Sequence, residues 1–153
     1  MKLFVQIPCL NEENTLASVI DSIPREIDGI DEIEILVIND GSTDRTVEVA
    51  KEHGVKHFVH HTTNMGLARS FRDGVDYALL HGADIVVNTD GDNQYPQAQI
   101  ADLVQPILRK EAEIVIGDRQ TRTIEHFSGF KKLMQRFGSW VASRAAGLDL
   151  PDA

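Results

Sequence analysis

The sequence contains no long hydrophobic run and only a single cysteine. No apolar stretch approaches the roughly 18 residues that a transmembrane helix requires, and residues 1–5 lead into a predicted strand rather than into a signal peptide. Because Cys9 is the sole cysteine, the chain cannot form an internal disulfide, which suits a reducing compartment. We therefore predict a cytoplasmic protein that is neither membrane-spanning nor held together by disulfides.

Positive charge is also scarce, and the formal net charge is -9. Phosphate backbones attract basic surfaces, so this balance argues against a nucleic-acid partner. The same charge would repel any phosphorylated ligand, and a divalent cation is the obvious means of offsetting that repulsion. Basic residues gather between Arg119 and Arg144, where six of them accompany one acid, Glu125.

The 153 residues fit one compact domain, and 42% of them are hydrophobic, which is enough for a core of that size. Apolar runs alternate along the chain with stretches of helical spacing. Strands are predicted over residues 3–8, 33–38, 55–60, 84–88 and 113–117, and helices over residues 15–23, 44–53, 67–81, 97–110 and 130–146. Ser42 or Thr43 is available to cap the second helix.

This alternation predicts an α/β fold with a mostly parallel sheet and helices on both faces. Ligands of such sheets bind outside the carboxyl ends of the strands, which lie along one edge. The chemistry is therefore expected in the loops at residues 8–13, 39–44 and 89–96. No G-x-G-x-x-G motif follows the first strand, which disfavours a nicotinamide-dependent dehydrogenase. No glycine-rich basic loop follows it either, which disfavours a sugar nucleotidyltransferase.

The loop after the fourth strand carries two carboxylates separated by one glycine. In an extended backbone, residues i and i+2 point the same way, so Asp90 and Asp92 are able to share one hard cation. Mg²⁺ and Mn²⁺ take oxygen ligands and often keep waters or substrate phosphates in their shell. Gly91 allows the backbone to approach a ligand closely. Taken alone, the same residues are more often an ordinary solvated turn.

The loops after the first and second strands carry further acids. Asp40 is able to accept a hydrogen bond from a base N–H or a ribose hydroxyl. Helix capping explains the residues that follow it, but does not require Asp40. Glu12 and Glu13 suit the positive end of the first helix, and this structural role is strong for Glu13 and fair for Glu12.

Taken together, these loops resemble those of the family 2 glycosyltransferases with the GT-A fold, a Rossmann-like α/β architecture. The matching residues are Ile7-Pro8-Cys9-Leu10-Asn11-Glu12-Glu13, Asn39-Asp40-Gly41-Ser42-Thr43-Asp44, Asn64-Met65-Gly66-Leu67-Ala68-Arg69 and Thr89-Asp90-Gly91-Asp92-Asn93-Gln94-Tyr95-Pro96. They span nearly the whole chain in the family's order. The sequence is most similar to the polyprenyl- and dolichyl-phosphate sugar transferases, whose metal loop also tends to run D-x-D-x-Q-x-P.

The resemblance implies a UDP- or GDP-linked sugar donor, with Mg²⁺ or Mn²⁺ on its diphosphate. Asp40 would read the base. The other implied site residues are Pro8, Leu10 and Glu12 around the base, Asp90, Gly91, Asp92 and Gln94 around the metal and diphosphate, and Arg69 at the diphosphate. For Arg69, a plain helix-surface position is an equally good interpretation.

The basic segment is expected to serve the acceptor side. Arg119 follows the fifth predicted strand, and its family position implies contact with the phosphate of a polyprenyl-phosphate-type lipid. His126 is expected to cap or pack rather than to catalyse. The 130–146 helix carries a basic side and an aromatic apolar face, which suits peripheral contact with the inner face of a membrane. Packing of that face on the domain, or on a second copy in a homodimer, is the favoured alternative.

We thus divide the chain into a nucleotide-sugar-binding core at residues 1–118 and an acceptor-side helical segment at residues 119–153. The family usually continues beyond this point with further helices, so the chain is expected to be an N-terminal piece that binds donor better than it transfers sugar. The competing interpretation is a nucleotide-sugar-binding module without transferase activity.

Overall fold

The computed structural model describes residues 1–117 of the chain, and within them a four-stranded, wholly parallel sheet has the order β3-β2-β1-β4. The elements are β1 (Lys2–Cys9), α1 (Leu16–Ser22), β2 (Glu32–Asp40), α2 (Thr46–Glu52), β3 (His57–His61), α3 (Leu67–Leu80), β4 (Ile85–Asn88), the 3₁₀ turn η1 (Gln97–Gln99) and α4 (Ile100–Leu108). The predicted α/β fold with a parallel sheet is confirmed.

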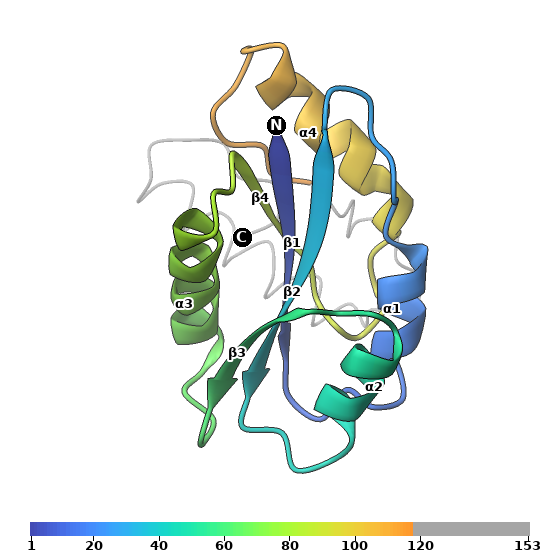
Figure 1. Ribbon diagram of the computed structural model, residues 1–153, viewed down its shortest axis with the longest axis vertical. Coiled ribbons are helices and arrows are strands. Elements are labelled where there is room, and N and C mark those ends of the chain that lie inside the picture. Colours follow the sequence, from blue (N-terminus) through green and yellow to red (C-terminus); the bar gives the residue numbers. More distant parts are fainter. Residues whose placement is uncertain (118–153) are drawn as a thin grey trace, which may run out of the picture. The chain divides into compact units, whose positions relative to one another are not determined.

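Helices cover both faces of the sheet, as predicted: α3 lies on one side, and α1, α2 and α4 lie on the other (Figure 1). The central strand β1 is a continuous apolar run because both of its faces are covered. Alternate residues of β1 supply the two cores, with Leu3 and Val5 facing one helix layer and Phe4 facing α3. The burial pattern therefore fixes which face each strand residue takes.

The parallel register brings the carboxyl ends of the strands to one edge. Cys9 of β1 lies opposite Asn39 of β2, and Asp40 of β2 lies opposite His61 of β3. The loops that begin at residues 10, 41 and 62 consequently start side by side. The loop after β4 joins the same edge, because β4 pairs with β1.

The strand predicted at residues 113–117 is wrong, because residues 114–117 form no strand. Ile114 and Ile116 are 81% and 78% exposed, and no strand within residues 1–117 pairs with them. An apolar run without a hydrogen-bonding neighbour gains neither backbone bonds nor burial as a strand. The predicted 130–146 helix lies outside the described residues.

Two helix starts also differ from the prediction. The fourth predicted helix opens with the 3₁₀ turn η1 before α4 begins at Ile100. The second helix begins at Thr46, and its N-cap residue Arg45 makes no side-chain capping bond. Asp44 accepts the Thr46 N–H instead, so capping by Ser42 or Thr43 is wrong. In the part of the chain that the structure covers, no helix has the length and apolar character to cross a bilayer.

Candidate active site

The loops after β1 and β2 are fastened together by Asn11. Its backbone N–H donates to Ser42 Oγ at 3.0 Å, and its own Oδ1 accepts the N–H of Thr43 at 2.8 Å. Asn11 has a φ of 59°, a left-handed conformation that asparagine tolerates better than most residues. Ser42 and Thr43 therefore hold the first loop instead of capping α2.

Two acids, Glu13 and Asp44, connect the loop after β1 to the start of α2. The Glu13 N–H donates to Asp44 Oδ2 at 3.1 Å, and Glu13 Oε2 accepts the Arg45 N–H at 3.0 Å. Asp44 also accepts the N–H and hydroxyl of Thr46. Burial acts to raise the pKa of Asp44, but these bonds outweigh burial and leave that pKa below its ordinary value. Glu13 and Asp44 thus brace the loops.

The Asp40 carboxylate is the most enclosed acid of this edge, with 6% of the residue exposed. It accepts the N–H groups of Met65 at 2.8 Å and Gly66 at 2.9 Å, and it lies 2.7 Å from His61 Nδ1. Burial acts to raise the pKa of Asp40, but the bonds to Met65, His61 and Gly66 lower it overall. A carboxylate offers about four acceptor positions, so one stays open for a ligand donor.

Gly41 lets the loop after β3 come close to Asp40. A side chain there would meet the Thr63 carbonyl carbon at 2.7 Å and the Asn64 nitrogen at 2.8 Å, and the φ of Gly41 is +83°. Both constraints demand glycine. The loop at residues 62–66 therefore belongs to the same site as the loop after β2.

The predicted metal loop packs against the loop after β1. Gly91 is buried, and a side chain there would lie 3.2 Å from Cys9 Sγ and 3.3 Å from Glu12 Cγ. Asp92 Oδ1 accepts the N–H of Gln94 at 3.1 Å, an Asx-type turn that shapes the loop. The structure thus brings Gly91, which lies between Asp90 and Asp92 in the sequence, next to Glu12.

The donor set fits a cation that is shared with a ligand. Within residues 1–117, no three His, Cys, Asp or Glu side chains lie together as a metal site. Asp90 and Asp92 supply carboxylate oxygens, the ligands that Mg²⁺ and Mn²⁺ prefer, and these ions commonly complete their shell with water and substrate phosphate. Cys9 is no competing ligand, because burial raises the pKa of its thiol and keeps it protonated.

Comparison with known proteins decides the family. The model of the family described as glycosyl transferase family 2 matches residues 4–145. The chain belongs to glycosyl transferase family 2. An undecaprenyl-phosphate mannosyltransferase of Micrococcus luteus is 27% identical in an alignment that covers 99% of this chain and 63% of that relative. A polyprenol monophosphomannose synthase of Mycolicibacterium smegmatis is 27% identical over 77% of this chain and 45% of its own length.

Solved structures support the same family fold. The crystal structure of glucosyl-3-phosphoglycerate synthase from Mycobacterium tuberculosis with Mn²⁺, UDP-glucose and phosphoglyceric acid is 34% identical, with a TM-score of 0.55. The alignment covers 72% of this chain and 40% of that one. The chain spans about half the length of the curated relatives that it matches.

In this family 2 chain, the remaining predicted site residues take varied positions. Pro8 is half-buried, and Leu10 is 40% exposed beside it. Gln94 is exposed. Arg69 is exposed on the first turn of α3, where its Nε lies 2.6 Å from Asp73 Oδ2. Arg119 lies outside the described residues, as do His126 and the proposed membrane or dimer contacts.

Sequence reasoning missed His61 and Asp73, two residues that lie behind Asp40. The His61 ring lies between the carboxylates of Asp40 and Asp73. A signal for His61 was present, because it directly follows the third predicted strand and so lies at the binding edge. Asp73 lies within α3, and the sequence pattern of that helix does not distinguish Asp73 from an ordinary surface acid.

The lowered pKa of Asp40 predicts an acid dependence of stability. A group whose pKa is lower in the folded protein stabilises it above the unfolded value, about 3.9, and that contribution is lost as pH falls through the folded value. We expect Asp40→Asn to lower the free energy of unfolding by about 1–3 kcal/mol at pH 7. The difference in the free energy of unfolding between wild type and this variant should then narrow as pH falls below about 4.

Urea unfolding between pH 2.5 and 7 measures this gap. Asp102→Asn, which removes an exposed carboxylate from α4, is the matched control. A gap that stays constant or widens in acid would contradict the role of these hydrogen bonds.

Proposed function

We propose that this chain forms the donor-binding part of a metal-dependent glycosyltransferase, which moves a sugar from a UDP- or GDP-linked donor to a polyprenyl-phosphate-type lipid. The observation that carries the proposal is the packing of the Asp90–Asp92 loop against Glu12 at the carboxyl edge of a parallel sheet. Asp40 would bind the base or ribose through its open acceptor position. Pro8 and Leu10 would contact the base, and the whole would work at the cytoplasmic side of a membrane.

Asp90 and Asp92 would hold Mg²⁺ or Mn²⁺, with Gln94 beside them. The bound cation would lower the cost of the negative charge that develops on the leaving diphosphate. Gly91 keeps the loop backbone against Cys9 and Glu12, and so fixes where the two carboxylates start. Arg69 would add positive charge at the diphosphate when it leaves its partner Asp73.

The names of two relatives and the chemistry of a phosphate acceptor support a lipid phosphate as the acceptor. The M. luteus relative is named for undecaprenyl phosphate and the M. smegmatis relative for a polyprenol. The oxygen of a lipid phosphate is already an anion, so transfer to it needs no general base, whereas an alcohol acceptor requires one. Arg119 would bind the acceptor phosphate. In this proposal, residues 1–118 bind the donor, and residues 119–153 contribute to binding of the acceptor.

A second candidate function is a nucleotide-sugar-binding module without transfer. The observation in its favour is that the chain covers only 63% of the M. luteus transferase and 45% of the M. smegmatis synthase. A transfer assay with a polyprenyl phosphate on this chain separates the two functions.

Calorimetric titration with UDP and GDP, in Mn²⁺ or in chelator, tests the donor site. We expect micromolar binding of one diphosphate in Mn²⁺, roughly -8 kcal/mol, and little binding in chelator. Binding that is equally tight in chelator would count against the metal. If neither nucleotide binds to this chain, the donor-site assignment fails.

A further inference from the structure

His61 makes two contacts that a neutral ring cannot make together. Its Nδ1 lies 2.7 Å from Asp40 Oδ1, and its Nε2 lies 3.2 Å from Asp73 Oδ2. Carboxylate oxygens only accept hydrogen bonds, and a neutral imidazole carries one N–H. Both bonds therefore form only when both ring nitrogens are protonated. With 9% of its side chain exposed, the His61 ring lies buried between two carboxylates.

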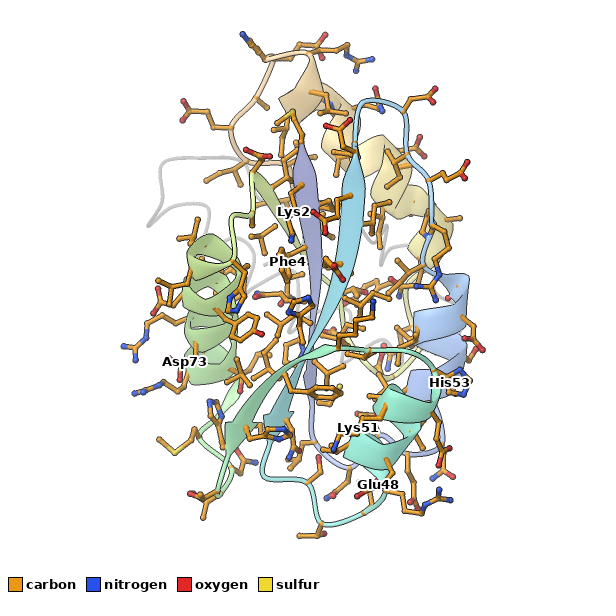
Figure 2. All side chains as sticks on the ribbon, in the orientation of Figure 1. Lys2, Phe4, Glu48, Lys51, His53 and Asp73 are labelled. Atoms are coloured by element: carbon orange, nitrogen blue, oxygen red, sulfur yellow. The ribbon has the colours of Figure 1, made fainter. Side chains whose placement is uncertain are left out.

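The charges continue beyond Asp73, which Figure 2 labels on α3. Asp73 Oδ2 also accepts Arg69 Nε at 2.6 Å, and Asp73 Oδ1 accepts Arg72 Nη2 at 3.2 Å. Carboxylate, imidazole, carboxylate and guanidinium groups thus alternate from β2 through β3 to α3. The groups that face His61 are Asp40 from β2 and, from α3, Asp73 with its two arginines.

We propose that His61 is a positioning residue for the donor nucleotide, acting through Asp40. Its Nδ1 fills one acceptor position of the Asp40 carboxylate, and the N–H groups of Met65 and Gly66 fill two more. The remaining acceptor position then points in one fixed direction, toward a base N–H or ribose hydroxyl. The same ring ties Asp40 through Asp73 to Arg69, so the base end and the diphosphate end of the site are held by one chain of contacts. This inference rests on the proposed function.

Two amide substitutions separate the contacts of the ring. In His61→Asn the amide nitrogen takes the place of Nδ1, so the bond to Asp40 is kept and the bond to Asp73 is lost. In His61→Gln the amide reaches the place of Nε2, so the bond to Asp73 is kept and the bond to Asp40 is lost. Both variants remove the imidazole ring and keep a polar side chain, so a comparison between them isolates the contact to Asp40.

Calorimetry with UDP and GDP in Mn²⁺, beside thermal unfolding, is the measurement. We expect His61→Gln to weaken binding of the preferred nucleotide about tenfold or more, the cost of one lost hydrogen bond to a charged group. We expect His61→Asn to stay within about threefold of wild type. His60→Asn is the matched control, because His60 is the exposed neighbour whose ring approaches Asn39, and it should bind as wild type does.

A double-mutant cycle with Asp40→Asn tests whether His61 acts through Asp40. If it does, His61→Gln should add less than about a twofold loss of affinity in the Asp40→Asn background, since interacting residues are not additive. Full additivity in affinity would overturn the proposal, and so would equal affinities of the Asn and Gln variants. If wild type binds neither nucleotide, the proposed function fails and this role falls with it. If wild type binds and the variants match it, only the role of His61 is overturned.

Discussion

Replacing Asp92 with alanine is expected to remove metal-dependent binding of the nucleoside diphosphate and, with it, sugar transfer. Asp90 and Asp92 are the two carboxylates of the loop, and no third His, Cys, Asp or Glu side chain joins them as a metal site within residues 1–117. One carboxylate alone would leave a cation held by water and diphosphate. We expect the rate of sugar transfer to fall roughly 100-fold or more, the range seen when one group that stabilises developing charge is removed.

Asp92 also shapes its own loop, because its Oδ1 accepts the Gln94 N–H. Asp92→Ala therefore removes a turn bond together with the negative charge. Asp92→Asn keeps an amide oxygen for that bond and removes only the charge, so it should lose metal-dependent binding while the loop keeps its shape. Asp102→Ala, which removes an exposed acid of α4, is the control for net charge.

Titration of Mn²⁺ with UDP or GDP into each variant gives the comparison, and sugar transfer to a polyprenyl phosphate gives the second readout. If Asp92→Asn bound the diphosphate in Mn²⁺ as tightly as wild type, Asp92 would be a turn residue and not a ligand. Loss of binding in Asp92→Ala alone would lead to the same conclusion. Loss in both, with Asp102→Ala unaffected, identifies the carboxylate charge as the cause.

The central strands could be predicted from the sequence because their burial does not depend on a particular partner. β1 and β2 are apolar runs covered on both faces, and the structure extends the predicted 3–8 and 33–38 by only one or two residues at each end. Residues 113–117 have a similar apolar character, yet the structure shows no strand there. Strand pairing is non-local, and an apolar run does not specify its neighbour.

The position of the site was predictable for the same reason, since parallel strands place their following loops at one edge. The contacts that fasten those loops were not predictable. The bonds of Asn11 to Ser42 and Thr43 depend on the register that sets Cys9 opposite Asn39. The contact between His61 Nδ1 and the Asp40 carboxylate likewise depends on His61 lying opposite Asp40 in β3. The register between two strands is set by the packing of the whole sheet, so these contacts could not be predicted from the loop sequences alone.

Replacing Gly74 with alanine is expected to lower the free energy of unfolding by about 2–4 kcal/mol. Gly74 is buried in α3, where a Cβ would lie 2.4 Å from Gln6 Oε1 and 2.9 Å from Ile38 Cδ1. Both neighbours are fully buried. Overpacking of a core costs about 1–3 kcal/mol, and alanine regains about 1 kcal/mol through its better helix propensity.

The further cost comes from Gln6, which cannot move aside without losing its hydrogen bonds. Its amide donates to Asn88 Oδ1 at 3.0 Å and to the Phe71 carbonyl at 3.5 Å. A buried polar group that loses its partner costs about 1–3 kcal/mol. A shift of α3 away from the sheet would relieve the contact, but it would also displace Asp73 and Arg69, so nucleotide affinity should fall with stability.

Chemical denaturation of Gly74→Ala, Gln6→Ala and the double variant tests this packing, with Asp76→Ala as the control on the exposed side of α3. The control should change stability by less than about 0.5 kcal/mol. Gln6→Ala removes the atom that a Cβ would meet first, so Gly74→Ala should cost less in that background, by about 1 kcal/mol or more. A Gly74→Ala protein as stable as wild type would mean that α3 packs less closely on β1 and β2 than these contacts require. If the two single losses simply added, relief would have to come from Ile38, and the close approach of α3 would be limited by β2 and not by Gln6.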